Sequence, residues 1–196
     1  MNKSSAILII LIIVIVTLPI FFITIPILFI MYNGIVKSKN RVEMSYSSID
    51  VFLKKRHDLI PNLVSSVKEI MQQEREVFEK ITRLRSRIPE TTNKEKRFEL
   101  ENDLSQALGS INVAVENYPD LKSTENMLQF QRSLNEIEEQ LSAVRRAYNQ
   151  NVLVFNDKVV SVPSNVMAGL LEYDKEPYFE IPEVEKANPN VGSLFR

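Results

Sequence analysis

Apolar and polar positions divide the chain into one uninterrupted apolar stretch and a longer region of regular periodicity. Ile, Leu, Val and Phe dominate from Ala6 to Met31, and no charged residue occurs between Lys3 and Lys37. As a helix rising about 1.5 Å per residue, this stretch would extend roughly 39 Å, more than the roughly 30 Å hydrocarbon core of a bilayer. The pattern predicts a transmembrane helix at residues 6–31.

A cleaved secretory signal is the alternative interpretation of this stretch. Its apolar region exceeds the roughly 7 to 15 residues of a typical signal, and no small-residue cleavage site follows Met31. We therefore expect a retained anchor in the cell membrane, preceded by a short flank at residues 1–5. Lys37, Lys39 and Arg41 follow the stretch, which predicts an N-terminus outside and a cytoplasmic remainder.

After Tyr32, apolar residues recur at alternating steps of four and three, the spacing of helices packed in bundles and coiled coils. The first stripe keeps its phase through Pro61, and Arg56 occupies one of its polar positions. A proline inside a helix usually kinks it. The pattern predicts one long helix over about residues 33–88, kinked near 56–61 and continuous with the transmembrane helix.

Prolines and capping residues divide the rest of the chain. Pro89 ends the first helix, and Thr91–Asn93 offers capping side chains for a second helix that stops near Pro119. Ser123 or Thr124 is expected to cap the third helix, which carries the most regular stripe in the chain.

Pro163 then ends or bends the third helix, and Ser164 is expected to cap a short fourth helix through Leu171. The predicted fold is all-α: a single N-terminal transmembrane helix, an elongated antiparallel four-helix bundle over residues 32–172, and a proline-containing tail over 173–196. Four glycines and the lack of alternating β-branched runs leave little room for a sheet.

Composition removes several classes of function. The formal net charge is −1, which gives no case for nucleic acid as a partner. The chain has no cysteine, so disulfides, thiolate nucleophiles and cysteine metal sites are excluded. His57 is the single histidine; Asp58 points about 100° away from it on a helix, and Lys54 stands where a Glu-x-x-His metal motif needs Glu. We expect no cofactor, no metal and no enzymatic activity.

Arg56 lies on the apolar stripe, and a buried guanidinium must be paired. Glu138, Glu139 and Asp157 are the candidate acids. The favoured interpretation of Arg56, His57, Asp58 and Asn62 is a polar lock that fixes the register of the bundle. A partner-binding surface and a small-ligand or ion site are the alternatives. For Asn149, Asn151 and Asn156 the favoured interpretation is amide hydrogen bonds inside the bundle, and recognition of a partner comes second.

Three strings of residues carry a family resemblance. The segment from Ser47 to Val64, which contains Arg56-His57-Asp58-Leu59-Ile60-Pro61-Asn62-Leu63-Val64, resembles the bacterial LemA family. So do Arg145-Arg146-Ala147-Tyr148-Asn149 with Phe155-Asn156, and Pro163–Leu171 followed by Tyr178-Phe179-Glu180. The resemblance implies a membrane-anchored antiparallel helical bundle with its N-terminus outside and with no established molecular activity.

We therefore expect a non-enzymatic interaction or scaffold module held in the lipid bilayer through residues 6–31. Its protein partners are unknown, and a second copy of the chain is one candidate. The alternatives are a self-assembling protein that organises or shapes membrane, and a carboxylate-metal enzyme. The candidate lock or partner surface comprises Arg56, His57, Asp58, Pro61, Asn62, Arg145, Arg146, Asn149 and Asn156.

Overall fold

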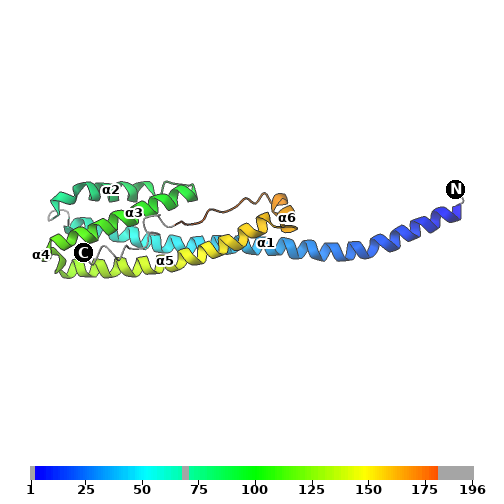
Figure 1. The fold of residues 1–196 in the computed structure, drawn as a ribbon, viewed down its shortest axis with the longest axis horizontal. Helices are drawn as coiled ribbons and strands as arrows, with labels where there is room; N and C mark the ends of the chain where they lie inside the picture. Colours follow the sequence, from blue (N-terminus) through cyan, green and yellow to red (C-terminus); the bar gives the residue numbers. More distant parts are fainter. Residues whose placement is uncertain (1–2, 68–70, 181–196) are drawn as a thin grey trace, which may run out of the picture. The chain divides into compact units, whose positions relative to one another are not determined.

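The computed structural model describes residues 3–67 and 71–180, and these residues form helices and connecting segments without a β-strand (Figure 1). This agrees with the predicted all-α class. The helices, in chain order, are α1 (Lys3–Val67), the 3₁₀ turn η1 (Gln72–Glu74), α2 (Arg75–Arg87), α3 (Lys94–Ala114), the 3₁₀ turn η2 (Val115–Asn117), α4 (Pro119–Lys122), α5 (Glu125–Val160) and α6 (Ser164–Leu170).

The chain forms two compact units. Of the described residues, the first unit contains 3–43 and 153–176, and the second contains 44–67, 71–152 and 177–180. Helices α1 and α5 each contribute to both units.

The prediction of one long helix reaching Ile88 is wrong. Helix α1 passes through Pro61 but ends at Val67, Met71 is not helical, and α2 begins at Arg75. In a continuous helix, His57 and Arg85 would be separated by about 42 Å. Instead, Arg85 Nε donates a 3.2 Å hydrogen bond to the backbone oxygen of His57, because α2 runs back along α1.

The stripe kept its phase across this turn because both α1 and α2 bury it in the same core. Met71 is fully buried, and the turn contains Gln and Glu without Gly or Pro, so no turn signal marked it. Helix α2, and not the short α6, is therefore the fourth member of the bundle.

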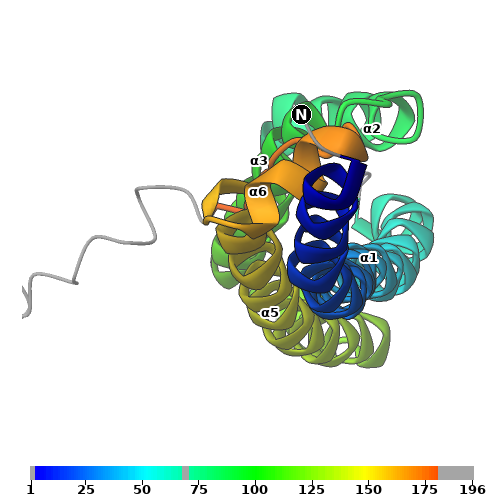
Figure 2. The ribbon, with the colours of Figure 1, turned by 90° about the vertical axis from the view of Figure 1, so that its right-hand side faces the viewer.

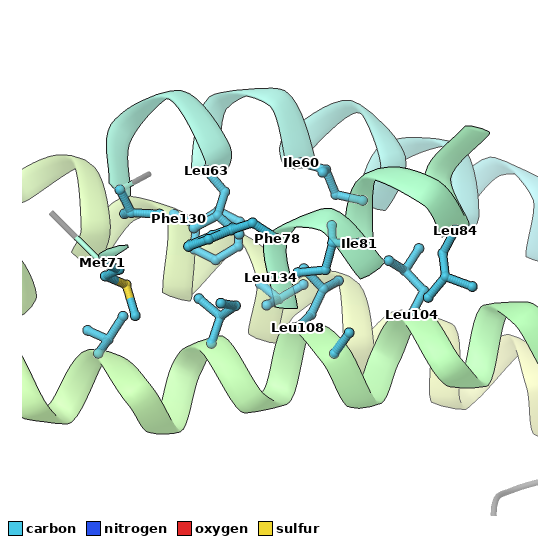
Figure 3. Close-up of a cluster of buried hydrophobic side chains, with 14 of the residues drawn as sticks. Ile60, Leu63, Met71, Phe78, Ile81, Leu84, Leu104, Leu108, Phe130 and Leu134 are labelled. Carbon is cyan, nitrogen blue, oxygen red and sulfur yellow. The ribbon is translucent and has the colours of Figure 1, made fainter. Parts of the chain in front are cut away.

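The bundle lies in the second unit, where its consecutive helices run in opposite directions (Figures 1 and 2). The end of α1, α2, α3 and the first half of α5 surround one apolar core. Figure 3 shows that side chains from all four helices meet there, and the cluster includes Ile60, Leu63, Phe78, Ile81, Leu104, Leu108, Phe130 and Leu134. Each side chain comes from the apolar stripe of its helix, so burial of the stripes accounts for the bundle.

Two of the three predicted caps form. Asn93 Oδ1 accepts the backbone N–H of Lys96 at 2.9 Å at the start of α3, and Thr124 Oγ1 accepts that of Met127 at 3.3 Å at the start of α5. The prediction for Ser164 is wrong. Pro163 is the N-cap residue of α6, and the Ser164 hydroxyl donates to the backbone oxygen of Ser161 instead.

The first unit joins the N-terminal part of α1 to the end of α5 and to α6. Lys158 Nζ donates a 2.6 Å hydrogen bond to the backbone oxygen of Gly34, and Phe155 packs edge-on against Tyr173. In the last part of the apolar run, residues 21–31, most of the side chains are exposed, with Ile30 at 71%. Among the described residues, α1 is the one helix long and apolar enough to cross a membrane.

Candidate functional site

Arg56 is buried at the centre of the bundle, with an exposed fraction of 0%. Its guanidinium donates to Ser105 Oγ at 2.5 Å, to Glu138 Oε1 at 2.8 Å and to the backbone oxygen of Glu101 at 3.2 Å. It also donates to the Glu101 carboxylate. We call these residues, together with His57, the Arg56 network. It joins three helices, because Arg56 belongs to α1, Glu101 to α3 and Glu138 to α5.

Glu138 was one of the three acids considered for Arg56, whereas the other two, Glu139 and Asp157, are exposed. Glu101 was not among the predicted partners of Arg56, although the sequence contains a pattern that indicates it. It lies three residues after Phe98 and three before Leu104, so it interrupts the apolar stripe of α3 as Arg56 interrupts that of α1. Polar residues at stripe positions on two predicted helices are candidates for a buried pair.

His57 completes the network from the side. Its Nε2 lies 3.3 Å from Glu101 Oε1, and its side chain is mostly buried. Burial of Glu101 by itself would raise the pKa of its carboxyl group. The close approach of His57 and the positive charge of Arg56 outweigh burial, so the pKa of Glu101 lies below its ordinary value. The network therefore keeps a charged carboxylate inside the bundle.

The other residues of the Arg56 string lie outside the network. Asp58 is exposed and lies 3.5 Å from Lys54, one turn earlier on α1. Pro61 and Asn62 are also exposed. The string therefore has two faces: Arg56 and His57 point into the bundle, while Asp58, Pro61 and Asn62 face outward.

Asn149 holds the chain after α6 against the second unit. Its Nδ2 donates to the backbone oxygen of Phe179 at 3.0 Å, and its Oδ1 accepts the N–H of the same residue at 2.8 Å. Arg145 stacks its guanidinium 4.3 Å from the centre of the Phe179 ring, and Tyr148 donates its hydroxyl to the backbone oxygen of Pro177 at 2.9 Å. An amide side chain fits this role because it offers one donor and one acceptor to one peptide residue.

Asn156 makes the same paired contact in the first unit. Its Nδ2 donates to the backbone oxygen of Glu176 at 2.9 Å, and its Oδ1 accepts the Glu176 N–H at 2.9 Å. The Glu176 carboxylate in turn pairs with Lys39. Burial would lower the pKa of Lys39, but the carboxylates of Glu176 and Glu43 raise it above its ordinary value.

Arg146 and Asn151 do not take part in the contacts that Asn149 and Asn156 make with Phe179 and Glu176. Arg146 is exposed and donates to Ser142 Oγ at 2.9 Å within α5. Asn151 is half-buried on the same helix.

A groove of about 550 Å³ opens beside the network among α1, α2 and the start of α3. His57, Arg85 and Arg97 line it together with Asp50 and Asp58, so it presents both signs of charge. Arg97 pairs with Asp50 at 2.8 Å. Burial raises the pKa of Asp50 above its ordinary value, although Arg97 opposes that shift.

Across residues 3–67 and 71–180, no group of three His, Cys, Asp or Glu side chains is arranged to hold a metal ion. The Arg56 network places charged groups where they hydrogen-bond one another. Its geometry can fix the positions of three helices.

Comparison with known proteins places most of the chain in one family. The chain is similar to the protein LemA of Metamycoplasma hominis, with 27% identity over 163 residues that cover 83% of this chain and 74% of the relative. The profile of the LemA family matches residues 45–192, which include the Arg56 string, both asparagine contacts and most of the bundle. The chain belongs to the LemA family.

Proposed function

We propose that the chain is a membrane-anchored helical-bundle module that presents a rigid surface to protein partners and catalyses no reaction. The observation that carries this proposal is the continuity of α1 from Lys3 to Val67. Its first part exposes a run of apolar side chains that water does not solvate favourably, and its last part forms one wall of the bundle core.

The anchor in this proposal is residues 6–31, with the N-terminus outside the cell membrane and the bundle in the cytoplasm. The lysines and arginine that follow the apolar run support this orientation. The exposed side chains of Phe22, Phe29 and Ile30 support lipid as their surroundings.

The Arg56 network supports rigidity, as a lock on the register of the bundle. A buried guanidinium and carboxylate satisfy each other only when α1, α3 and α5 are correctly aligned. A helix shifted by one turn would separate these groups and leave charges buried without partners. In this proposal Asn149 and Asn156 hold the chain near Glu176 and Phe179 in place, and the outward face of Asp58, Pro61 and Asn62 is available to a partner.

Topology is tested with single cysteines, because the natural chain has none. Ser4→Cys and the exposed Glu139→Cys are expressed separately in cells and treated with a maleimide that does not cross membranes. We expect Ser4→Cys to react in intact cells and Glu139→Cys to react only after permeabilisation. The reverse result would overturn the orientation, and labelling of both in intact cells would overturn the anchor.

Partner binding is tested by photocrosslinking in membranes from positions 58 and 62, with position 139 on α5 as the matched exposed control. A discrete adduct at 58 and 62 that is absent at 139 supports a partner surface on this face of α1. Adducts made only with a second copy of the chain favour self-assembly over the scaffold. Absence of adducts at 58 and 62, in cells where the bundle is folded, contradicts a partner surface there.

A further inference from the structure

The turn between α5 and α6 is unusually apolar for an exposed segment. No charged residue occurs from Val159 to Leu171, a segment that we call the apolar tip; Lys158 and Glu172 bracket it. Within it Val162 is 82% exposed, Val166 63% and Leu170 73%. Single exposed apolar residues are common on protein surfaces, but several close together mark an interaction site.

The apolar face of α6 is continuous along the helix. Val166 and Leu170 are four residues apart, so they project from the same side of α6. Val162 lies in the turn, four residues before Val166. The opposite side of α6 is buried, since Met167 and Ala168 pack into the first unit. The helix therefore turns one side toward α1 and leaves the other without a protein partner among the described residues.

The position of the apolar tip in the first unit indicates what covers it. Met167 lines an apolar groove of about 470 Å³ whose other walls are Ile25, Leu28, Phe29 and Tyr32 of α1. These α1 residues form the last turns of the proposed transmembrane segment and its exit. Helix α6 therefore lies beside α1 (Figure 1), next to the last turns of the proposed anchor.

A polar contact holds this arrangement just beyond the anchor. Lys158, the last charged residue before the apolar tip, donates to the backbone oxygen of Gly34. Gly34 follows Tyr32 by two residues, where a transmembrane helix enters the headgroup region. A lysine at that level is compatible with the polar headgroups, and the uncharged tip that follows it is compatible with the adjoining acyl chains.

We propose that the apolar tip is a second membrane contact, which inserts Val162, Val166 and Leu170 into the interfacial layer of the bilayer beside the anchor. The inference rests on the anchor of the proposed function. Its occupant is lipid, because α6 packs through Met167 beside the last turns of the proposed anchor, which lipid would surround. The ends of both α1 and α5 in the first unit would then be fixed at the membrane surface, as for an interfacial apolar segment.

The test uses the full chain in vesicles of phosphatidylcholine and phosphatidylglycerol, with a single cysteine carrying an environment-sensitive fluorophore. The label is placed in the apolar tip with Val166→Cys or Leu170→Cys, and in the anchor with Ile15→Cys. Glu139→Cys places it on the exposed surface of the bundle, as the control in water. Vesicles without a quencher are compared with vesicles whose lipids carry a quencher at a shallow acyl position, for the apolar tip, or at a deep acyl position, for residue 15. We expect emission at 166 and 170 to fall about twofold with the quencher lipid, as for an interfacial segment, and emission at 139 to stay unchanged.

The four positions separate failure of the inference from failure of the anchor. Quenching at 15 without quenching at 166 and 170 would overturn the tip contact and leave the anchor standing. No quenching at 15 would overturn the anchor itself, and the tip proposal with it. A blue-shifted emission at 166 that the quencher lipid does not reduce would show that protein covers the tip, which would also overturn the proposal.

Because Val166 and Leu170 are exposed, their replacement should leave the fold intact. Circular dichroism of each labelled variant checks this directly. Val162→Ser combined with Leu170→Ser, measured with the label at Val166→Cys, should reduce quenching at 166 and leave helix content unchanged. Unchanged quenching at 166 in that variant would contradict insertion through the apolar face.

Discussion

Two stretches of α1 invert the usual distribution of residues between surface and interior. At the end of its apolar run, Phe29 and Ile30 expose most of their side chains, while in the bundle Arg56 is fully buried. Neither arrangement is stable by itself in water, since exposed apolar area and a buried charge both carry a cost. The two stretches differ in what offsets that cost. For the apolar side chains we propose that it is lipid, and for Arg56 it is the carboxylates of Glu101 and Glu138.

This difference shows that the polarity of a residue does not determine its burial along a helix. A buried charge requires a partner at one geometry, so the Arg56 network makes the bundle specific. Lipid accepts apolar side chains in any orientation, so the early part of α1 needs only length and composition. Experiments that remove the partner should therefore affect the bundle far more than those that change exposed charges.

The largest effect is expected from Glu101→Leu. This change removes the carboxylate and leaves a guanidinium that cannot release its proton inside the bundle. We expect the free energy of unfolding to fall by about 3 kcal/mol or more, as for other broken buried pairs. Urea unfolding of the full chain in detergent micelles, followed by circular dichroism, measures the loss, and Glu99→Gln, two residues away and exposed, is the matched control.

Arg56→Leu should cost less than Glu101→Leu, because the abandoned carboxylates can take up protons or keep His57 as a partner. The double variant Arg56→Leu with Glu101→Leu should be more stable than Glu101→Leu alone. If Arg56→Ala unfolds like the natural chain, Arg56 does not act as a lock and the partner-surface interpretation gains support.

A smaller effect is expected for Asn149→Ala, which removes both hydrogen bonds to Phe179. The loss should be about 1–2 kcal/mol, because the freed backbone groups are half-buried and water can partly replace the amide. Hydrogen exchange at the Phe179 amide should become faster. Gln150→Ala, the exposed neighbour, is the control, and equal exchange rates in the two variants would show that Asn149 does not hold this segment.

Acid should weaken the bundle through Glu101. Its pKa is lower in the folded protein than the ordinary pKa of a glutamate in the unfolded chain, so its charged form contributes stability at pH values above that ordinary pKa. That contribution is lost as the pH falls through the lower folded pKa. Thermal unfolding midpoints should therefore decrease below about pH 5 more steeply in the natural chain than in Glu101→Gln. Parallel curves for the two proteins would contradict this role.

The smallest effect is expected for Asp58→Asn. Asp58 is two residues from Arg56, but it is exposed and its pair with Lys54 is a solvated one within one helix. The expected change in the free energy of unfolding is about 0.5 kcal/mol or less. A loss comparable to that of Glu101→Leu would mean that Asp58 belongs to the lock. The inward residues Arg56 and His57 would then no longer differ in role from Asp58.

Much of the fold could be predicted because the sequence signals of a helix involve residues that are only a few positions apart. The stripe spacing identified the residues that α1, α3 and α5 bury, and it identified Arg56 as a polar residue among them. Capping by Asn93 and Thr124 was predicted for the same reason, since the side chain and the N–H that it binds are three residues apart.

The turn at Met71 was not predictable by this reasoning. Stripe phase reports which side of a helix is apolar, but two antiparallel helices that share a core carry the same signal as one continuous helix. The extended contacts of Glu176 and Phe179 were missed as partners of Asn156 and Asn149 because they join residues 20 and 30 positions apart. No local pattern connects an amide side chain with an irregular segment at that distance.

The sequence by itself determined the apolar run, the helical class, the family and the burial of Arg56, because each depends on residue type and on spacing within a few turns. Tertiary structure alone decided that α2 folds back on α1, that Glu101 meets Arg56 45 residues away, and that Asp58 faces outward while Arg56 faces inward. The physical reason is that helix formation depends on local hydrogen bonds and stripes, whereas the pairing of buried charges depends on where separate helices come to rest.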